Sequence, residues 1–512
     1  YHRALDLVER SLTAHGGVEP IETAGGFRLC QEGSFDLATR LQGRSSLRPE
    51  PTPIAECTSY DAKAGRVGYD INWFNYYSSN QDLREVYDAV GRVLFIDKRN
   101  RNGGWLPIAT VADSRERLLR MLPNMLLADA LEQRTTLRWA GERRVDGRPL
   151  DIISYTTSAG DTLSIAIDRQ TLLVSSVTTL FEMPLLGDTE IEWRWSDFTR
   201  SDEGLTVPGH LVVSLGGTVM KDVRLSTVLG ADATDFEAPE GVTVEEPPDA
   251  IPPLSEFVPY GERPPIVETL APQVHMVTSL RPGFGLLFVE FEKFVLAVDA
   301  PTGWYEMNQL PPMNWSHGDS IAALGKKYLR AIRQTVPGKP VRYVALTHHH
   351  SDHIGGLRAF TEAGATLLAG ETAARMARLA VESPATLSGD DWDDADPGSV
   401  DIDVVRGERV IADASMEVRL IELPDGNPKA DNYLMVYLPK QKLLYATAFI
   451  YPVPEAVFPP KESIPLSRYF VDWLDNSGLE IERVYNLHAM RRVEEWQLEK
   501  VRGLAGSDAT KN

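Results

Sequence analysis

The six-residue segment HHHSDH, which begins at His348, holds four histidines and one aspartate. Imidazoles two residues apart in extended chain, here those of His348 and His350, project to the same side and can reach one metal ion. Asp352 and His353 follow at the turn and can serve a second metal position. The side chain of His349 points to the other side of the chain, and we assign it a structural role.

The elements around this segment are expected to hold it in an exposed but rigid loop. The preceding run VRYVAL (341–346) has the composition of a buried strand, and a helix is expected to open at Ile354. Gly355 and Gly356 allow the start of that helix to pack closely. Folds that alternate strands and helices carry their chemistry in such loops. The remaining histidines have no neighbours of this kind and are interpreted as ordinary surface or core residues: His2, His15, His210, His275 and His317.

The first part of the chain has the pattern of a β-rich domain. Runs such as TLSIAIDRQTLLVSSVTTLFEM and TEIEWRWSDFTR alternate apolar with polar residues between turn signals, as half-buried antiparallel strands do. Helices are expected over residues 3–13 and 113–133, and Pro123 is expected to kink or divide the second one. Residues 1–244 are therefore predicted to form a mostly antiparallel β domain with a few helices.

Seven prolines lie between residues 245 and 265, and they force extended, non-helical backbone. This segment is predicted to be a linker between two domains. From residue 266 onward strands and helices alternate, beginning with a strand pair that turns near Glu292 and Lys293. Residues 266–512 are therefore predicted to form a layered domain of strands and helices.

The composition argues against nucleic acid as a partner and against a transmembrane segment. The formal net charge of −21 leaves no basic face for a phosphate backbone, so nucleic acid is not expected as a partner. No apolar run approaches the length that a transmembrane segment needs, and the rich run YLMVYLP has only the length of a strand. A small molecule is the expected substrate, and a protein partner would be bound through the N-terminal β domain.

Cys30 and Cys57 are the two cysteines of the chain, and they flank what read as neighbouring antiparallel strands. A disulfide between them is geometrically conceivable and would suit an oxidising compartment. Two buried free thiols in a cytoplasmic protein are the alternative. We expect a periplasmic or secreted protein, and the cytoplasm stays open as the other location.

The segment HHHSDH and the IGGL that follows it fit the HxHxDH signature of the metallo-β-lactamase fold superfamily. The resemblance covers residues 270–505. GLLFVEFEKFVLAVDAP resembles the opening hairpin of that fold, NYLMVYLPKQKLLYATAFIYP a later strand pair, and VYNLHAM the last metal-binding strand end. The resemblance implies an αββα sandwich, in which two facing mixed sheets lie between helices and bind metal at one edge. The N-terminal half has a fold-level likeness to the sheets of lipoprotein carriers.

A complete two-metal site in this family uses three further ligands, and this sequence keeps one of them. The final histidine is present as His488. The position of the preceding histidine falls at or beside Pro428, and the position of the bridging aspartate falls on Ala448. The resemblance therefore implies one metal position with three ligands, Asp352, His353 and His488, and an open coordination site for water.

His348 and His350 remain as a pair of imidazoles without a third ligand. We expect them to bind a second ion weakly, or to act as hydrogen-bond partners and proton relays with a pKa close to neutral. Three side chains in the segment PDGNPKADN can act as substitute ligands, although this segment also has the composition of a turn: Asp425, Asn427 and Asp431.

The resemblance implies a metal-dependent hydrolase. One zinc ion is expected, with manganese or iron as alternatives, and it would activate water to attack an ester, lactone, amide or similar small substrate. We assign a part in catalysis to Asp352, His348 and His350, and the candidate metal ligands are His348, His350, Asp352, His353 and His488. The alternative is a degenerate family member without turnover, which acts as a binding or scaffold protein.

Two further segments are candidates for the border of a substrate pocket. Trp304, Tyr305 and Trp315 lie in a region that walls the substrate site in this family, although ordinary aromatic packing explains them equally well. The acidic segment 388–398 is expected to be a solvated loop near the predicted metal edge.

Overall fold

The structure is a computed structural model of the chain. It describes residues 1–36, 51–75, 79–88, 93–98, 101–106, 118–158, 160–183, 185–244, 264–281, 284–302, 321–387, 400–451, 455, 458–459, 463–488 and 491–504.

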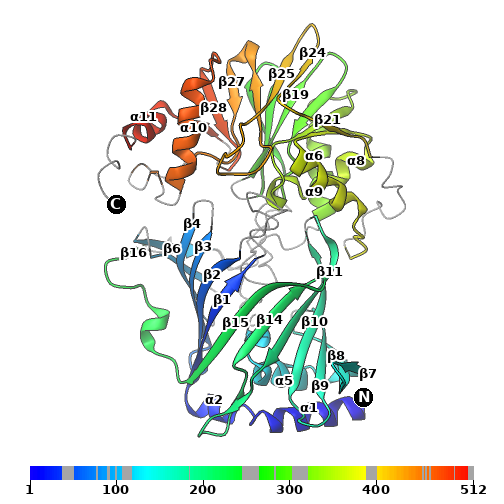
Figure 1. Cartoon of the computed structure of the whole chain (residues 1–512), viewed down its shortest axis with the longest axis vertical. Coiled ribbons are helices and arrows are strands. Elements are labelled where there is room, and N and C mark those ends of the chain that lie inside the picture. Colours follow the sequence, from blue (N-terminus) through cyan, green and yellow to red (C-terminus); the bar gives the residue numbers. More distant parts are fainter. Residues whose placement is uncertain are drawn as a thin grey trace.

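The N-terminal half forms one strongly curved sheet of 14 strands (Figure 1). The strands lie in the order β16-β6-β5-β4-β3-β2-β1-β15-β14-β11-β10-β9-β8-β7, and β16 pairs with β6 in parallel while the other neighbours are antiparallel. A separate two-stranded sheet pairs β12 (Thr199–Arg200) with β13 (Thr206–Val207). The bounds of the large sheet are β1 Gly26–Phe35, β2 Thr52–Asp61, β3 Arg66–Asn75, β4 Ser79–Tyr87, β5 Val93–Asp97, β6 Asn102–Leu106, β7 Arg138–Val145, β8 Arg148–Thr156, β9 Thr162–Asp168, β10 Val174–Met183, β11 Gly187–Ser196, β14 His210–Leu215, β15 Thr218–Leu229 and β16 Thr243–Val244.

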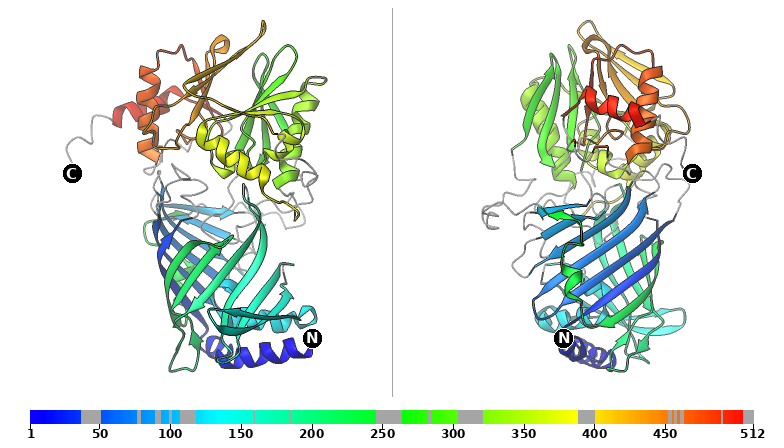
Figure 2. Two further views of the ribbon diagram at one scale, coloured as in Figure 1. Left: turned by 45° about the vertical axis from the view of Figure 1, so that its right-hand side comes forward. Right: turned by 90° about the vertical axis from the view of Figure 1, so that its left-hand side faces the viewer.

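Alternating side chains explain why these segments form a sheet with one buried face. Along β11 every second residue is buried, among them Ile191, Trp193 and Trp195. Helices cover one end of the curved sheet, and Figure 2 shows α1 lying across that end. The bounds are α1 His2–Ala14, α2 Glu19–Thr23, α5 Pro123–Glu132, η1 Arg134–Thr136 and η2 Ala233–Phe236. The predicted β-rich fold of this half is confirmed.

Pro123 divides the second predicted helix. Residues 118–121 are helical, Leu122 is extended at φ −132° and ψ 118°, and α5 starts at Pro123 itself. Proline suits the first position of a helix, where the backbone N–H has no partner within the helix. The prediction for Pro123 is confirmed, while residues 113–117 of the predicted helix lie outside the described residues.

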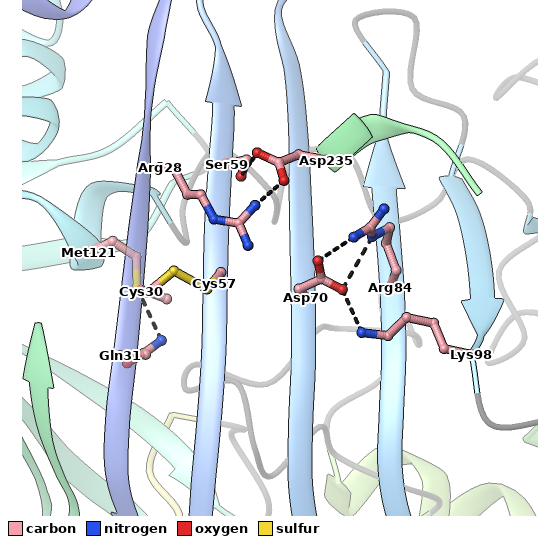
Figure 3. The surroundings of a disulfide bond; sticks show 10 residues. All are labelled: Arg28, Cys30, Gln31, Cys57, Ser59, Asp70, Arg84, Lys98, Met121 and Asp235. Carbon is pink, nitrogen blue, oxygen red and sulfur yellow. Dashed lines mark hydrogen bonds and ion pairs between the residues drawn. A yellow bond between two sulfur atoms is a disulfide. The ribbon is translucent and has the colours of Figure 1, made fainter. Parts of the chain in front are cut away.

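Cys30 and Cys57 form a disulfide (Figure 3). They stand directly opposite each other on the neighbouring antiparallel strands β1 and β2. The sequence left open whether the two cysteines form a disulfide or remain free thiols, and the structure contains the disulfide.

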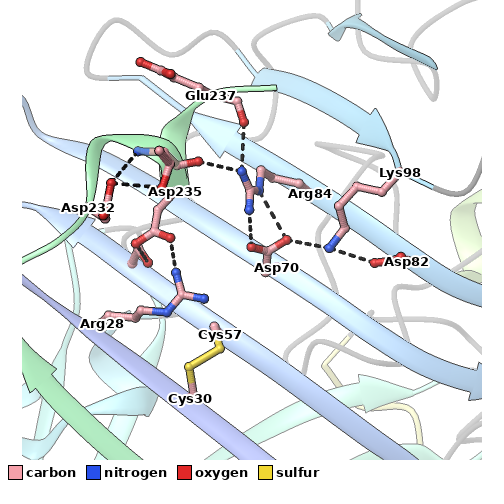
Figure 4. A network of polar contacts seen from close by, with 12 residues as sticks. Arg28, Cys30, Cys57, Asp70, Asp82, Arg84, Lys98, Asp232, Asp235 and Glu237 are labelled. Atoms are coloured by element: carbon pink, nitrogen blue, oxygen red, sulfur yellow. Dashed lines mark hydrogen bonds and ion pairs between the residues drawn. A yellow bond between two sulfur atoms is a disulfide. The ribbon is translucent and has the colours of Figure 1, made fainter. Parts of the chain in front are cut away.

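A network of charged side chains joins η2 to strands β1, β3 and β4 of the large sheet (Figure 4). Arg84 on β4 donates hydrogen bonds to Asp70 on β3 and to the carbonyl oxygen atoms of Thr234 and Glu237, at 2.6 and 2.8 Å. Asp235 binds the guanidinium group of Arg28 on β1. The network fixes the end of the N-terminal half against the face of its own sheet.

The C-terminal half contains two facing sheets (Figure 1). The first has the order β17-β18-β19-β20-β21-β22-β23, antiparallel as far as β20 and parallel from there on. The second has the order β24-β25-β26-β27-β28-β29, antiparallel except for the parallel pair β27 and β28. The strands are β17 Ile266–Ala271, β18 Val274–Arg281, β19 Phe284–Glu290, β20 Val295–Val298, β21 Val341–Leu346, β22 Thr366–Ala369, β23 Ile402–Val404, β24 Glu408–Ala412, β25 Glu417–Glu422, β26 Leu434–Leu438, β27 Leu443–Tyr445, β28 Arg483–Asn486 and β29 Arg491–Val493.

Helices pack on the outer face of each sheet, which gives four layers. β19 is apolar and buried on both faces, because Leu287 faces the second sheet while Phe288 faces the helices. α6 and α9 cover the first sheet, and α10 and α11 cover the second. The helices are α6 Ile321–Thr335, α7 Ser351–Ile354, α8 Arg358–Glu362, α9 Glu371–Glu382, η7 Pro439–Gln441, α10 Ile464–Asn476 and α11 Glu495–Leu504. The predicted αββα sandwich is confirmed.

The two halves meet where the hairpin of β10 and β11 reaches the end of α9 (Figure 1). The Asp188 carboxylate accepts hydrogen bonds from the backbone nitrogen atoms of Thr386 and Leu387, at 2.8 and 3.3 Å. A Cβ atom on Gly187 would lie 1.9 Å from the carbonyl oxygen of Pro384, so only glycine allows this approach. The hairpin of β10 and β11 thus holds the segment after α9 through hydrogen bonds and close packing.

Several predictions fall on residues that the structure does not describe. The predicted linker 245–265 lies outside the described residues apart from its last two positions, and the division of the chain at this point stays a prediction. Trp304, Tyr305 and Trp315 and the acidic segment 388–398 also lie outside the described residues. Among the described helices, none combines the length and the apolar character that a membrane crossing requires.

Candidate metal centre

The histidine segment lies at the carboxyl end of β21. Residues 347–350 are irregular, and α7 begins at Ser351, so that Asp352 and His353 lie within its single turn. The expectation that a helix opens at Ile354 is therefore wrong. The turn starts earlier because His350 is extended, at φ −63° and ψ 136°, and serves as the N-cap residue.

The chain that follows β20 holds α7 in position. The backbone N–H groups of Ala300 and Thr302 donate to the carbonyl oxygen atoms of His353 and Asp352, at 2.8 and 3.0 Å. A Cβ atom on Gly355 would lie 2.5 Å from Thr302 Oγ1, so the glycine allows the close contact that the sequence suggested. Asp352 and His353 are thereby fixed at the edge of the first sheet.

His488 reaches the same edge from the second sheet. It follows β28, and its backbone N–H donates to Asn486 Oδ1 at 2.6 Å. The imidazole ring lies between two aromatic rings, with centroid distances of 4.8 Å to Phe284 and 5.2 Å to Tyr451. These contacts fix the direction of the ring.

Asp352, His353 and His488 converge. One ligand atom from each of the three side chains lies within 4.8 Å of the others, and all three residues are buried. The Nε2 atom of His353 is 3.6 Å from Asp352 Oδ2. Two imidazoles and one carboxylate form a donor set that suits zinc as well as manganese or iron.

Asp299 determines which nitrogen atom of His353 is available. His353 Nδ1 lies 3.2 Å from Asp299 Oδ2, and the carboxylate also accepts bonds from Thr347 N and Thr347 Oγ1, at 2.7 and 2.8 Å. An ionised carboxylate only accepts, so Nδ1 carries the proton and Nε2 keeps its lone pair. That Nε2 atom is buried and makes no hydrogen bond to the described residues.

His348 and His350 lie beside the triad. The centroid of the His348 ring is 4.3 Å from that of His350 and 4.1 Å from that of His353. Thr347 Oγ1 donates to Asp299, so His348 Nδ1, 2.9 Å away, donates to Thr347 Oγ1. His348 Nε2 is buried and has no hydrogen-bond partner among the described residues.

Burial keeps these imidazoles neutral. Burial lowers the pKa of both His348 and His350 well below the ordinary value, and the positive charge of Lys429 acts in the same direction. The same causes act on His488. The expected pKa close to neutral is therefore wrong for His348 and His350, because the sequence does not reveal their complete burial. Neutral imidazole is, however, the form that binds metal.

His349 does not join the cluster. Its ring is perpendicular to that of His350, at a centroid distance of 5.0 Å, and burial lowers its pKa to about 3. The structure thus separates His349 from the ligand candidates, as the alternation along the chain suggested.

The structure places the two positions at which the resemblance implies a missing ligand. Ala448, the position assigned to the bridging aspartate by the resemblance, is fully buried three residues after β27 and carries only a methyl group. Asn427 does not act as a substitute ligand, because its side-chain oxygen accepts from the backbone of Lys429 and Ala430, both at 3.0 Å. Asp425 is exposed. The turn interpretation of this segment fits these contacts.

Sequence reasoning missed residues that support the site from behind. Asp299 directly follows the buried strand β20. A carboxylate at the end of a buried strand was the feature of the sequence that could have identified this residue. Tyr433 stacks on His348 at a centroid distance of 4.8 Å, and its hydroxyl bonds Thr447 Oγ1, which is 3.3 Å from Thr347 Oγ1. Lys429 is buried in the same region. Nothing in their residue types marks them as parts of a metal site.

The residues present fit one divalent ion. Three donors of suitable chemistry converge, the lone pair of His353 Nε2 is buried and makes no hydrogen bond to the described residues, and a carboxylate orients that ring from behind. The pair His348 and His350 offers two donors only.

Comparison with known proteins gives one family. Residues 316–488 match the model of the Metallo-beta-lactamase superfamily. No curated protein matches the chain.

The solved structures that resemble the chain include metallo-beta-lactamases at low identity. One from Pontibacter korlensis is 16% identical with a TM-score of 0.33, over 47% of this chain and 99% of that one. FIM-1 from Pseudomonas aeruginosa, in a mono-zinc form, is 18% identical with a TM-score of 0.33, over 48% and 95%. One from Hirschia baltica is 15% identical with a TM-score of 0.32, over 47% and 98%.

The assignment rests on the family match and on the observed layers, not on these scores. The matched residues contain the histidine segment and end at His488. The C-terminal half of the chain has the metallo-beta-lactamase fold, and residues 316–488 match the model of that superfamily.

Proposed function

We propose that the C-terminal half is a hydrolase that binds one divalent metal ion through Asp352, His353 and His488. Membership of the superfamily supports a metal-dependent, hydrolase-like protein. The observation that carries the finer proposal is the convergence of these three buried side chains, which lie far apart in the sequence, within 4.8 Å. Zinc is the proposed ion, with manganese or iron as alternatives.

Each residue of the centre has a separate part. Asp352, His353 and His488 would hold the ion, which would supply a lowered pKa for bound water and polarisation of a carbonyl or phosphoryl oxygen. Asp299 holds the His353 ring with Nε2 turned to the triad. The Nε2 atom of His348 makes no hydrogen bond to the described residues and is placed to accept one from water or substrate. The proposed substrates are small esters, lactones, amides or similar molecules.

A scaffold protein without turnover is the second candidate. The observation in its favour is the replacement of two family ligands by Pro428 and Ala448. Such a protein would bind a partner through its curved N-terminal sheet. Metal content separates the candidates, because a scaffold has no need to retain an ion.

We also propose that the protein works in an oxidising compartment, after export to the periplasm or secretion. The Cys30–Cys57 disulfide supports this location, since such bonds persist mainly outside the cytoplasm. The net charge of −21 argues against nucleic acid as a partner or substrate.

The test is the metal content of protein purified without a metal-affinity column. We expect about one equivalent of ion per chain in the wild type. His488→Ala and Asp352→Asn should lose it, whereas His210→Ala, which changes a partly exposed histidine in the N-terminal half, should retain it. A wild type without metal, with a melting temperature that neither zinc nor a chelator changes, would favour the scaffold.

A further inference from the structure

The curved N-terminal sheet encloses a cavity on the face that carries its buried side chains. The walls are formed by strands β1, β2, β3, β11, β14 and β15 and by the helical residues 118–121. The space measures about 560 Å³ when the part open to solvent is included. Much of the wall is aromatic or aliphatic: Phe35, Tyr69, Ile71, Trp193, Leu211 and Val213.

Two polar residues of this wall stand directly opposite each other. Gln31 on β1 pairs with Glu56 on β2, so their side chains leave the sheet on the same face. Gln31 is 1% exposed and Glu56 is 7% exposed. Lys221 on β15 reaches the same carboxylate, and its Nζ atom donates to Glu56 Oε2 at 2.7 Å. The cavity therefore has a buried amide and a buried carboxylate side by side in an otherwise mainly apolar wall.

One oxygen atom of each of these two side chains needs a donor. Glu56 Oε1 and Gln31 Oε1 are buried and make no hydrogen bond to the described residues. The amide nitrogen of Gln31 is turned to Met121, with Nε2 3.8 Å from Sδ (Figure 3). Both oxygen atoms are acceptors, and a buried acceptor without a donor is unfavourable. A molecule with two neighbouring O–H groups would satisfy both.

The charges at the cavity favour an uncharged molecule. Glu56 is paired with Lys221, and Arg120 binds Asp161 at 3.2 Å. A further carboxylate of the wall, that of Asp70, has two cationic partners. Because each of these charges is already compensated, an ionic ligand would lose its water without gaining a partner of opposite charge. Hydroxyl groups donate without carrying a charge.

We propose that this cavity binds a small uncharged vicinal diol. One hydroxyl group donates to Glu56 Oε1 and its neighbour donates to Gln31 Oε1, while the apolar part of the molecule packs against Trp193 and Ile71. Water is the competing occupant, since it also donates to buried acceptors. The site does not depend on the proposed metal centre, which lies in the other half of the chain.

The experiment compares three probes that share a phenyl ring and differ in hydroxyl groups. 1-Phenylethane-1,2-diol, 2-phenylethanol and ethylbenzene are titrated against the full chain, and saturation-transfer NMR measures their binding. We expect a dissociation constant of about 1 mM for the diol. Each hydroxyl group that is removed should weaken binding by about 10-fold. Phenylacetate and phenethylammonium, which carry a charge, should also bind more weakly than the diol.

Variants locate the binding. Gln31→Leu removes one acceptor, so it should weaken the diol by about 10-fold and leave 2-phenylethanol, which keeps the carboxylate acceptor, unchanged. Gln170→Leu is the matched control, because Gln170 is an exposed glutamine in the turn between β9 and β10. Thermal melts verify folding. If Gln31→Leu is not folded, Ile71→Phe, which narrows the cavity, should weaken all three probes.

A diol can also bind a metal ion, so His488→Ala separates the two halves of the chain. This variant should bind the diol as the wild type does, whether or not the proposed hydrolase is correct. Three results would overturn the inference: no binding of the diol at about 10 mM, as for a cavity that holds water alone; equal affinities for the diol and ethylbenzene; or equal effects of Gln31→Leu and Gln170→Leu. Loss of diol binding in His488→Ala would likewise contradict it.

Discussion

His353 and Asp299 are joined by a buried hydrogen bond in which the ring Nδ1 atom lies 3.2 Å from the carboxylate Oδ2 atom. Both residues are fully buried. The bond selects the tautomer of His353 and turns Nε2 toward Asp352 and His488. The availability of one proposed ligand atom thus depends on a residue outside the proposed ligand set.

Replacing Asp299 with asparagine should weaken metal binding. The amide would present N–H to the Nδ1–H group of His353 and would favour the other tautomer, which has a proton on Nε2. We expect zinc affinity to fall by about 10- to 100-fold, as for other partners of metal-binding histidines. Competition with a chromophoric chelator measures it. Asp403→Asn, which removes a surface ion pair with Arg409, should leave the affinity unchanged.

His15 should make stability depend on pH. Its Nδ1 atom donates to the carbonyl oxygen of Thr206 at 3.2 Å, and its Nε2 atom accepts the backbone N–H of Val174 at 3.0 Å. Burial lowers its pKa from 6.5 to about 4. Between these values the unfolded chain binds more protons, so the stabilisation is complete above pH 6.5 and is lost as the pH falls toward 4.

At pH 4.5 the loss attributable to His15 should be about 2 to 3 kcal/mol in the free energy of unfolding. Urea unfolding followed by tryptophan fluorescence at pH 7.5 and 4.5 measures it. His15→Gln removes the titrating group and should show a smaller difference between the two pH values than the wild type. His210→Gln should show the wild-type difference, and equal differences in all three proteins would contradict the prediction.

The contact between the hairpin and the end of α9 should depend on Asp188. In Asp188→Ala the backbone N–H groups of Thr386 and Leu387 lose their acceptor, at a cost of about 1 to 2 kcal/mol. Hydrogen exchange at these two amides should become about 10-fold faster or more. Gly187→Ala should have a similar effect, because its Cβ atom collides with Pro384.

Glu190→Ala is the control for this contact, since Glu190 lies exposed on the same strand. It should leave exchange at Thr386 and Leu387 unchanged. If Asp188→Ala also leaves it unchanged, the contact between the halves is weaker than the hydrogen bonds indicate.

Reduction of the Cys30–Cys57 disulfide should destabilise the N-terminal sheet. The bond closes a loop of 27 residues, and releasing it should cost about 3 kcal/mol through the entropy of the unfolded chain. Denaturant unfolding with and without reductant measures the loss. The double variant Cys30→Ser and Cys57→Ser should resemble the reduced protein and should not respond to reductant.

The spacing of His348, His350, Asp352 and His353 was sufficient to predict a candidate metal site, because these residues are close in sequence and lie after a strand. His488 could be included only through the family resemblance, since nothing in its surroundings links it to residue 353. Lys429 could not be predicted, because an isolated lysine in a turn is normally exposed. The low pKa of the imidazoles follows from burial, which depends on the assembled layers.

In the N-terminal half the alternation of side chains predicted strands but not their order. Thr243 pairs in parallel with Asn102, across more than a hundred residues, and no local signal encodes such a partner. The sequence equally left open whether Cys30 and Cys57 were bonded. Their pairing depends on the register of β1 against β2, which places them opposite each other.

The hydroxyl groups behind the metal centre form a row with a fixed direction. Burial raises the pKa of Tyr433, so its hydroxyl keeps the proton and donates to Thr447, which donates to Thr347, which donates to Asp299. Each group has one proton to give, so a single anion orients the whole row. If the Asp299 carboxylate were neutralised, each hydroxyl group of the row could donate in the opposite direction. The lone pair of His348 would then lie on Nδ1 instead of Nε2.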